Sequence, residues 1–235
     1  VLDEYVRIGL ETCKKLRISP HIEDLPYQDR QSPGFSDLAR VDIWGPVKNH
    51  LVILIHGGFW QEGTRKAISP AAVNLVKRGI AAASVGYNYA SSANPFLLRI
   101  YPKAKSVSLV GHSAGAQMAF KVFSNIRSPR IERLVLIAGI YNLDDLPNCE
   151  IGALIGLTPE EAKKNACDAS ELEGTNVRVL MMAAMKDSPK LIEQNQAMAE
   201  SLKSKGVAVE YEVRSGSKVN EEITYFTTYP NAFGT

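Results

Sequence analysis

Short runs of apolar residues that alternate with helix-like segments constrain the fold of this chain more than any other feature. The runs lie at residues 51–55, 79–87, 107–111, 133–138 and 177–183. Near-continuous apolar runs of this length are typical of parallel strands that are buried on both faces. Two further runs, 39–44 and 207–213, alternate apolar and polar residues instead. We expect the first to begin the sheet and the second to lie nearer a sheet edge, where one face meets solvent.

Helix start and stop signals occupy segments between these runs. Ser69-Pro70 predicts a helix that ends at Gly79, and Ser188-Pro189 predicts a longer helix that ends at Gly206. Thr158-Pro159-Glu160-Glu161 has the sequence of a capping box, with proline at the first helical position. Strands that alternate with helices form parallel βαβ units. The pattern therefore predicts one α/β domain over residues 1–235, with a mostly parallel central sheet and helices on both of its faces.

One connection between two predicted strands contains less helical sequence than the others. Between residues 89 and 105, only the segment PFLLRIYP has helical character, and its prolines limit a helix to about two turns. A right-handed crossover between parallel strands usually carries a full helix. We therefore expect this chain to lack one crossover helix of a complete domain.

Composition argues against several classes of function. The formal net charge is +2 and the basic residues are scattered, so nucleic acid and membrane surfaces are poor candidates for the main partner. No stretch approaches the roughly 18 consecutive apolar residues of a membrane span, and the charged segment 1–17 is unlike a signal peptide. The three cysteines are widely spaced and lack metal-type pairing. These features predict a soluble, cytoplasmic protein from a reducing compartment, with no metal.

A serine lies where a predicted strand turns into a predicted helix. In VSLVGHSAGAQMAF, residues 107–120, the apolar run leads into Gly111-His112-Ser113-Ala114-Gly115, and an amphipathic segment follows. A G-x-S-x-G sequence in this context is typical of a nucleophile elbow, although the pattern also occurs by chance in loops. We predict that Ser113 is the nucleophile and that the N–H of Ala114, at a helix N-terminus, stabilises an oxyanion. His112 fits a packing neighbour better than a general base.

A second motif follows the predicted strand at residues 51–55, which leads into His56-Gly57-Gly58-Phe59-Trp60. Paired glycines let the backbone come close to a substrate, so the N–H groups near Gly58 and Phe59 can complete an oxyanion hole. Alone, the segment fits an ordinary Gly-Gly loop with an aromatic plug equally well. Its position upstream of the serine motif favours the oxyanion hole.

Together, HGGFW at residues 56–60 and GHSAG at residues 111–115 resemble the HGGxW and GHSAG motifs of arylformamidases (kynurenine formamidases), a branch of the α/β-hydrolases. The resemblance covers about residues 25–216, through DLPYQD, RVDIWGP, IAGIYNLDDL and KDSPKLIEQNQAMAESLKSKGVAVEYEV. It implies an α/β-hydrolase fold and a serine hydrolase without a cofactor. The implied reaction is hydrolysis of N-formyl-L-kynurenine to L-kynurenine and formate, in tryptophan catabolism.

The resemblance also implies roles for individual residues. It makes Ser113 the nucleophile and Asp187 the triad acid that orients a histidine. It places the oxyanion hole at Gly57, Gly58, Phe59 and Ala114. Asp187 could instead, or in addition, be the N-cap of the helix that begins at Ser188-Pro189. Phe59 and Trp60 would line the pocket for an aryl formamide or ester substrate, or would belong to the core.

The triad histidine is missing from the place where the resemblance predicts it. The histidines are His21, His50, His56 and His112, and all precede Ser113. The family's histidine lies in the loop after the last strand, which here is residues 214–220 and contains Lys218 but no histidine. A lysine base would need burial that greatly lowers its pKa, and the polar sequence around Lys218 predicts no such pocket. Without a base the serine hydroxyl is a weak nucleophile, so we expect impaired activity.

Three hypotheses of function follow from the sequence. The first is a serine hydrolase of the arylformamidase type. The second keeps the chemistry but changes the substrate, which gives a small-acyl carboxylesterase. The third is a catalytically inactive α/β-hydrolase that acts as a binding protein, and the missing histidine and short crossover favour it for this chain.

Overall fold

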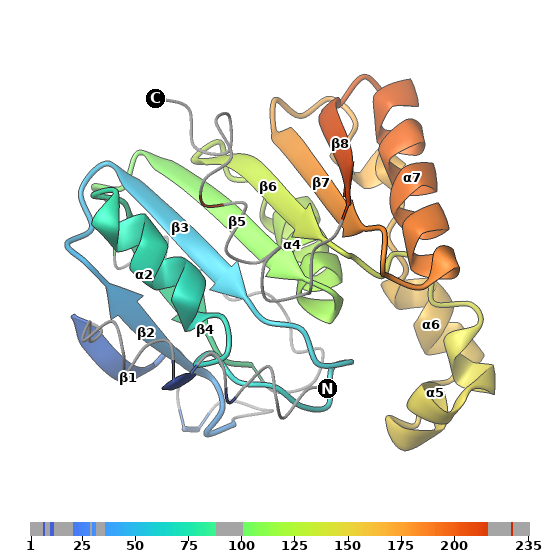
Figure 1. The fold of residues 1–235 in the computed structure, drawn as a ribbon, viewed down its shortest axis with the longest axis horizontal. Helices are drawn as coiled ribbons and strands as arrows, with labels where there is room; N and C mark the ends of the chain where they lie inside the picture. Colours follow the sequence, from blue (N-terminus) through green and yellow to red (C-terminus); the bar gives the residue numbers. More distant parts are fainter. Residues whose placement is uncertain are drawn as a thin grey trace.

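An eight-stranded sheet in the order β1-β2-β4-β3-β5-β6-β7-β8 forms the centre of the molecule (Figure 1). This computed structural model describes residues 7, 10, 11, 21–28, 30, 31, 36–87, 101–215 and 227. The strands are β1 (Ile22–Pro26), β2 (Arg40–Trp44), β3 (His50–Ile55), β4 (Ala81–Val85), β5 (Ser106–His112), β6 (Ile131–Ile137), β7 (Arg178–Ala184) and β8 (Ala208–Arg214). The pairs from β4 to β8 are parallel, whereas β2 is antiparallel to both β1 and β4. The predicted, mostly parallel sheet is confirmed.

Alternate residues of the central strands enter two separate hydrophobic clusters. In β3, Leu51 and Ile53 belong to one cluster, whereas Val52 and Leu54 belong to the other. Successive side chains of a strand point to opposite faces of a sheet, so a strand that is covered twice must be apolar along its whole length. This explains why the central strands follow near-continuous apolar runs of the sequence.

The two edges of the sheet differ from its centre. β8 is an edge strand with exposed and half-buried residues, as its alternating sequence predicts. At the other edge the expectation that residues 39–44 begin the sheet is wrong, because β1 precedes β2 and Ile22 lies opposite Ile43. The sequence of β1, IEDLP, contains two acidic residues and a proline, which give little strand signal.

Helices cover both faces of the sheet, as predicted (Figure 1). α2 (Ser69–Lys77) packs on one face, against β2 and β4. α4 (Ala114–Ile126) and α7 (Pro189–Ser204) pack on the opposite face, against β5–β6 and β7–β8 respectively. α5 (Glu150–Leu154) and α6 (Pro159–Asn165) follow β6, between the short 3₁₀ helices η1 (Leu146–Asn148) and η2 (Ala169–Leu172).

The predicted helix ends are also observed. The Thr158 hydroxyl accepts the Glu161 N–H at 3.2 Å, and the Glu161 carboxylate accepts the Thr158 N–H at 3.0 Å, which completes the capping box of α6. Ser188 is the N-cap of α7, and its hydroxyl accepts the Leu191 N–H. The short crossover expected between residues 89 and 105 lies largely outside the described residues, which exclude 88–100.

Candidate active site

Ser113 lies in a strained turn between β5 and α4. Its φ is 53° and its ψ is −121°, a conformation that residues other than glycine rarely adopt. The Ser113 N–H donates to the Ile137 carbonyl of the neighbouring strand at 2.8 Å, which helps to hold the turn. A Cβ on Gly111 would lie 2.1 Å from the Gly115 oxygen, and one on Gly115 would lie 2.3 Å from the Ile55 oxygen. Both flanking glycines of the motif are therefore required by close backbone contacts.

Residues 56–63, here termed the HGGFW loop, lie directly beside this turn. A Cβ on Gly57 would be 3.0 Å from the Ser113 Cβ and 2.8 Å from the His112 oxygen. Gly58 has a φ of 130°, and a Cβ there would lie 1.9 Å from the Glu62 oxygen. The Gln61 and Glu62 N–H groups both donate to the Gly58 carbonyl, at 2.9 and 3.0 Å. The paired glycines thus allow a tight loop whose backbone reaches the serine.

The two aromatic residues of the loop have different environments. Phe59 and Trp60 both have positive φ values, 48° and 59°. The Phe59 side chain is 39% exposed, whereas Trp60 is 7% exposed and packs in a cluster with Ala114 and Leu143. The Trp60 Nε1–H donates to the Gln117 Oε1 at 3.2 Å. Trp60 therefore occupies the core, and only Phe59 is open to a ligand from solvent.

His56 and His112 lie next to the serine but are held in the neutral form. The His56 Nδ1 is 2.7 Å from the Gly57 carbonyl, which can only accept, so Nδ1 carries the proton. The His56 ring stacks on Tyr87 with 4.4 Å between ring centroids, and the Tyr87 hydroxyl donates to the His56 carbonyl. Burial lowers the pKa of His56 to about 4. Burial lowers the pKa of His112 to about 4, and repulsion between the protonated forms of His112 and His56 acts in the same direction.

Asp187 follows β7, at the same sheet edge as the serine. In the strand register His112 lies opposite Ile137, and Ile137 lies opposite Met182, so the ends of β5 and β7 are separated only by β6. Neighbouring strands lie about 4.8 Å apart, so β5 and β7 are about 10 Å apart. The Asp187 Oδ2 accepts the Ala184 N–H at 2.9 Å. The alternative that Asp187 is the N-cap of α7 is wrong, because Ser188 is the N-cap.

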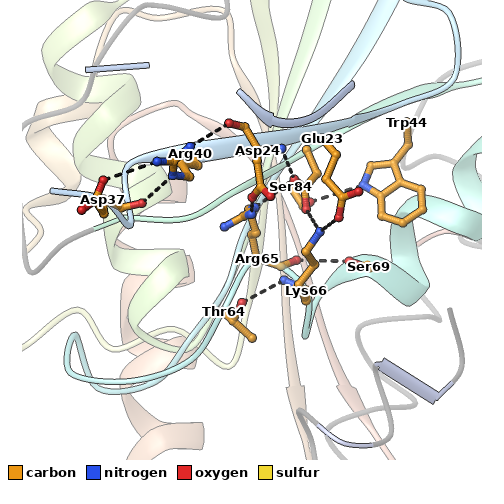
Figure 2. A network of polar contacts seen from close by, with 11 residues as sticks. Glu23, Asp24, Asp37, Arg40, Trp44, Thr64, Arg65, Lys66, Ser69 and Ser84 are labelled. Carbon is orange, nitrogen blue, oxygen red and sulfur yellow. Dashed lines mark hydrogen bonds and ion pairs between the residues drawn. The ribbon is translucent and has the colours of Figure 1, made fainter. Parts of the chain in front are cut away.

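A charged cluster that the sequence analysis did not single out anchors the segment after the HGGFW loop (Figure 2). Asp42 of β2 is completely buried, with its Oδ1 2.9 Å from Arg65 Nε and its Oδ2 2.8 Å from Lys66 Nζ. Arg65 also pairs with Asp24, and Lys66 with Glu23, both from β1. Burial raises the pKa of the Asp42 carboxyl, while Lys66 acts to lower it. The one sequence signal was an aspartate within the apolar strand RVDIW.

Three further sequence expectations concern Lys218 and its loop, a metal site and a membrane span. Lys218 and most of the loop in which the histidine was expected lie outside them, since 216–226 are not described. Across the described part of the chain, no group of three or more histidine, cysteine, aspartate or glutamate side chains could hold a metal ion. Within the same residues, no helix is long and apolar enough to cross a membrane.

Solved structures identify the class of fold. An esterase from the archaeon Pyrobaculum calidifontis has a TM-score of 0.69 at 16% identity, over 97% of this chain and 91% of that chain. A carboxyl esterase from the fungus Tuber melanosporum has a TM-score of 0.64 at 18% identity, over 99% of this chain and 100% of that chain. The chain therefore has the α/β-hydrolase fold, as predicted.

Sequence relatives give a narrower likeness, although no family model matches the chain. A kynurenine formamidase of Danio rerio is 26% identical over an alignment of 232 positions, which covers 88% of this chain and 76% of that protein. A kynurenine formamidase of Drosophila melanogaster is 26% identical over an alignment of 251 positions, which covers 92% of this chain and 81% of that protein. The predicted resemblance to kynurenine formamidases is confirmed over most of the chain.

Proposed function

We propose that this chain is a serine hydrolase of the kynurenine formamidase type, which cleaves N-formyl-L-kynurenine to L-kynurenine and formate. The observation that carries the proposal is the contact of the HGGFW loop with the elbow, where a Gly57 Cβ would lie 3.0 Å from the Ser113 Cβ. The serine is thereby adjoined by two backbone segments whose N–H groups can donate hydrogen bonds, namely Gly57–Phe59 and the start of α4. The likeness to kynurenine formamidases supports the substrate class.

In this proposal the Ser113 Oγ attacks the formyl carbon and gives up its proton to a base. The carbonyl oxygen becomes an oxyanion, which accepts hydrogen bonds from the Ala114 N–H and from the HGGFW loop. The C–N bond then breaks, and the arylamine nitrogen takes the proton and leaves as L-kynurenine. Water attacks the formyl ester on Ser113, restores the hydroxyl and releases formate. No metal or organic cofactor takes part in these steps.

The general base is the catalytic group that the proposal explains least well. No histidine follows Ser113 in the sequence, and the buried His56 and His112 are poor bases because burial lowers the pKa of each to about 4. The loop after β8, residues 214–220, where the resemblance places the triad histidine, contains no histidine for Asp187 to orient. We expect turnover about 10⁴-fold slower than that of a complete triad, because loss of one triad member leaves only oxyanion and binding contributions. The same observation favours, as second candidate, an inactive binding protein.

Formate release from N-formyl-L-kynurenine tests the proposal. We would compare the unmodified chain with Ser113→Ala and with Ser201→Ala, which removes an exposed hydroxyl from α7. Formate release that persists in Ser201→Ala and disappears in Ser113→Ala would support the proposal. Faster cleavage of short acyl esters than of the formamide would favour a carboxylesterase. If the folded chain cleaves neither the formamide nor the esters, the proposed enzymatic activity is refuted and the binding protein is favoured.

A further inference from the structure

The backbone of the HGGFW loop adopts a conformation that its own sequence does not favour. Phe59 and Trp60 are consecutive bulky residues with φ values of 48° and 59°. Left-handed backbone is disfavoured for side chains that carry a Cβ, and most of all for large ones. Such a conformation persists only where surrounding contacts fix it. The loop therefore needs an anchor, and its N–H groups are useful for catalysis only if that anchor also sets their position.

The anchor lies on the helix that follows the serine. The indole of Trp60 is buried, and its Nε1–H donates to the Gln117 Oε1 at 3.2 Å. Gln117 belongs to α4 and is only 6% exposed. It lies four residues after Ser113, one helical turn above the nucleophile, so its side chain lies over the first turn of α4.

The orientation of the Gln117 amide is fixed from both ends. Its Oε1 accepts from the indole, while its Nε2 donates to the Asn165 carbonyl at the end of α6 at 2.8 Å. In a flipped amide the Gln117 NH₂ would face the indole N–H, and its oxygen would face the Asn165 carbonyl. Burial leaves little water to replace the two lost hydrogen bonds. Gln117 thus joins the HGGFW loop, the first turn of α4 and the end of α6 through two buried hydrogen bonds.

We propose that Gln117 is a positioning residue, which acts through Trp60 to hold the HGGFW loop at a fixed distance from the N-terminus of α4. This inference rests on the proposed function, because the two joined segments are the two sources of N–H groups for the oxyanion. The oxyanion needs donors from both segments at hydrogen-bonding distance from one oxygen atom. A loop that drifts by a few tenths of an ångström would still bind substrate but would stabilise the transition state less.

Hydrogen exchange measured by mass spectrometry tests the positioning without requiring turnover. The reporters are the Gln61 and Glu62 amides, which close the loop by donating to the Gly58 carbonyl. Gln117→Met removes both polar groups at similar size, and Trp60→Phe keeps an aromatic ring but removes the donor. The matched control is Gln196→Met, which changes an exposed glutamine of α7.

We expect faster exchange at the two reporter amides in Gln117→Met and in Trp60→Phe, no additional increase in the double variant, and no change in Gln196→Met. Reporter exchange in Gln117→Met that equals the unmodified chain would overturn the proposal. An equal rise in α7 would also overturn it, because that result indicates general destabilisation.

Turnover provides a second readout that a purely structural role would not give. Where the unmodified chain releases formate, we expect Gln117→Met to lower kcat about 10-fold while KM changes less than about twofold, because only transition-state stabilisation is lost. A rise in KM with kcat unchanged would overturn the proposal. If the unmodified chain releases no formate, the proposed function fails, and hydrogen exchange alone decides whether Gln117 positions the loop.

Discussion

Acidification should destabilise this protein through His56. The residue is 3% exposed, its ring stacks on Tyr87, and its Nδ1–H donates to the Gly57 carbonyl. A second proton on this imidazole would place a buried positive charge at the start of the HGGFW loop. The folded state therefore disfavours the imidazolium, which is why burial lowers the pKa of His56 from its ordinary value of 6.5 to about 4.

The sign of the effect follows from proton linkage. As the pH falls through 6.5, the unfolded chain takes up a proton at His56 while the folded chain does not, so the free energy of unfolding decreases. The decrease continues until the pH reaches the folded-state pKa of about 4, below which both states are protonated. The full loss is about 3 kcal/mol, and the loss between pH 7 and pH 5 is about 2 kcal/mol. His112 acts in the same direction.

Urea unfolding at pH 7, 6 and 5 measures this loss. His56→Asn is the informative variant, because the asparagine amide can still donate to the Gly57 carbonyl but does not titrate. We expect the decrease in unfolding free energy between pH 7 and pH 5 to be smaller in this variant by about 2 kcal/mol. His21→Asn, which changes an exposed histidine, is the control. Equal pH dependence in the unmodified chain and in His56→Asn would refute the burial argument, as would an equally large effect of His21→Asn.

Two further substitutions test other contacts of the site by their effect on the urea midpoint. Asp42→Ala removes the buried carboxylate together with its contacts to Arg65 and Lys66 and should cost about 3 kcal/mol, whereas Asp37→Ala, at a side chain 79% exposed, should cost less than about 0.5 kcal/mol. If the two substitutions lower the free energy of unfolding equally, the buried charged cluster does not contribute to stability as argued. Gly115→Ala sets a Cβ 2.3 Å from the Ile55 oxygen and should cost about 3 kcal/mol, against about 1 kcal/mol for Gly174→Ala, where φ is 74° and no atom lies within 4 Å. If Gly115→Ala lowers the free energy of unfolding no more than Gly174→Ala does, the backbone of the elbow can shift to accommodate a Cβ at little cost.

Features that depend on neighbouring residues were predictable from the sequence. The central strands follow apolar runs because a strand covered on both faces must be apolar throughout, and the capping box of α6 follows from the side chains of Thr158 and Glu161. The elbow at Ser113 was predictable for the same reason, since strand, glycine-flanked serine and helix are adjacent in the chain. The local residue pattern did not predict β1, because IEDLP carries little strand signal and is held by pairing with β2.

What depends on residues that are distant in the sequence appeared only in the folded chain. The sequence offered pocket and core as alternatives for Phe59 and Trp60, and the packing of α4 and α6 buries Trp60 while leaving Phe59 exposed. Likewise, Asp42 becomes a buried counter-charge only because β2 lies beside the segment that carries Arg65 and Lys66. By itself the sequence determined the fold class, the elbow and the absence of a histidine from the loop at residues 214–220. The tertiary structure decided which loop adjoins that serine and which side chains hold it, because burial and close contact between distant residues exist only after the chain has folded.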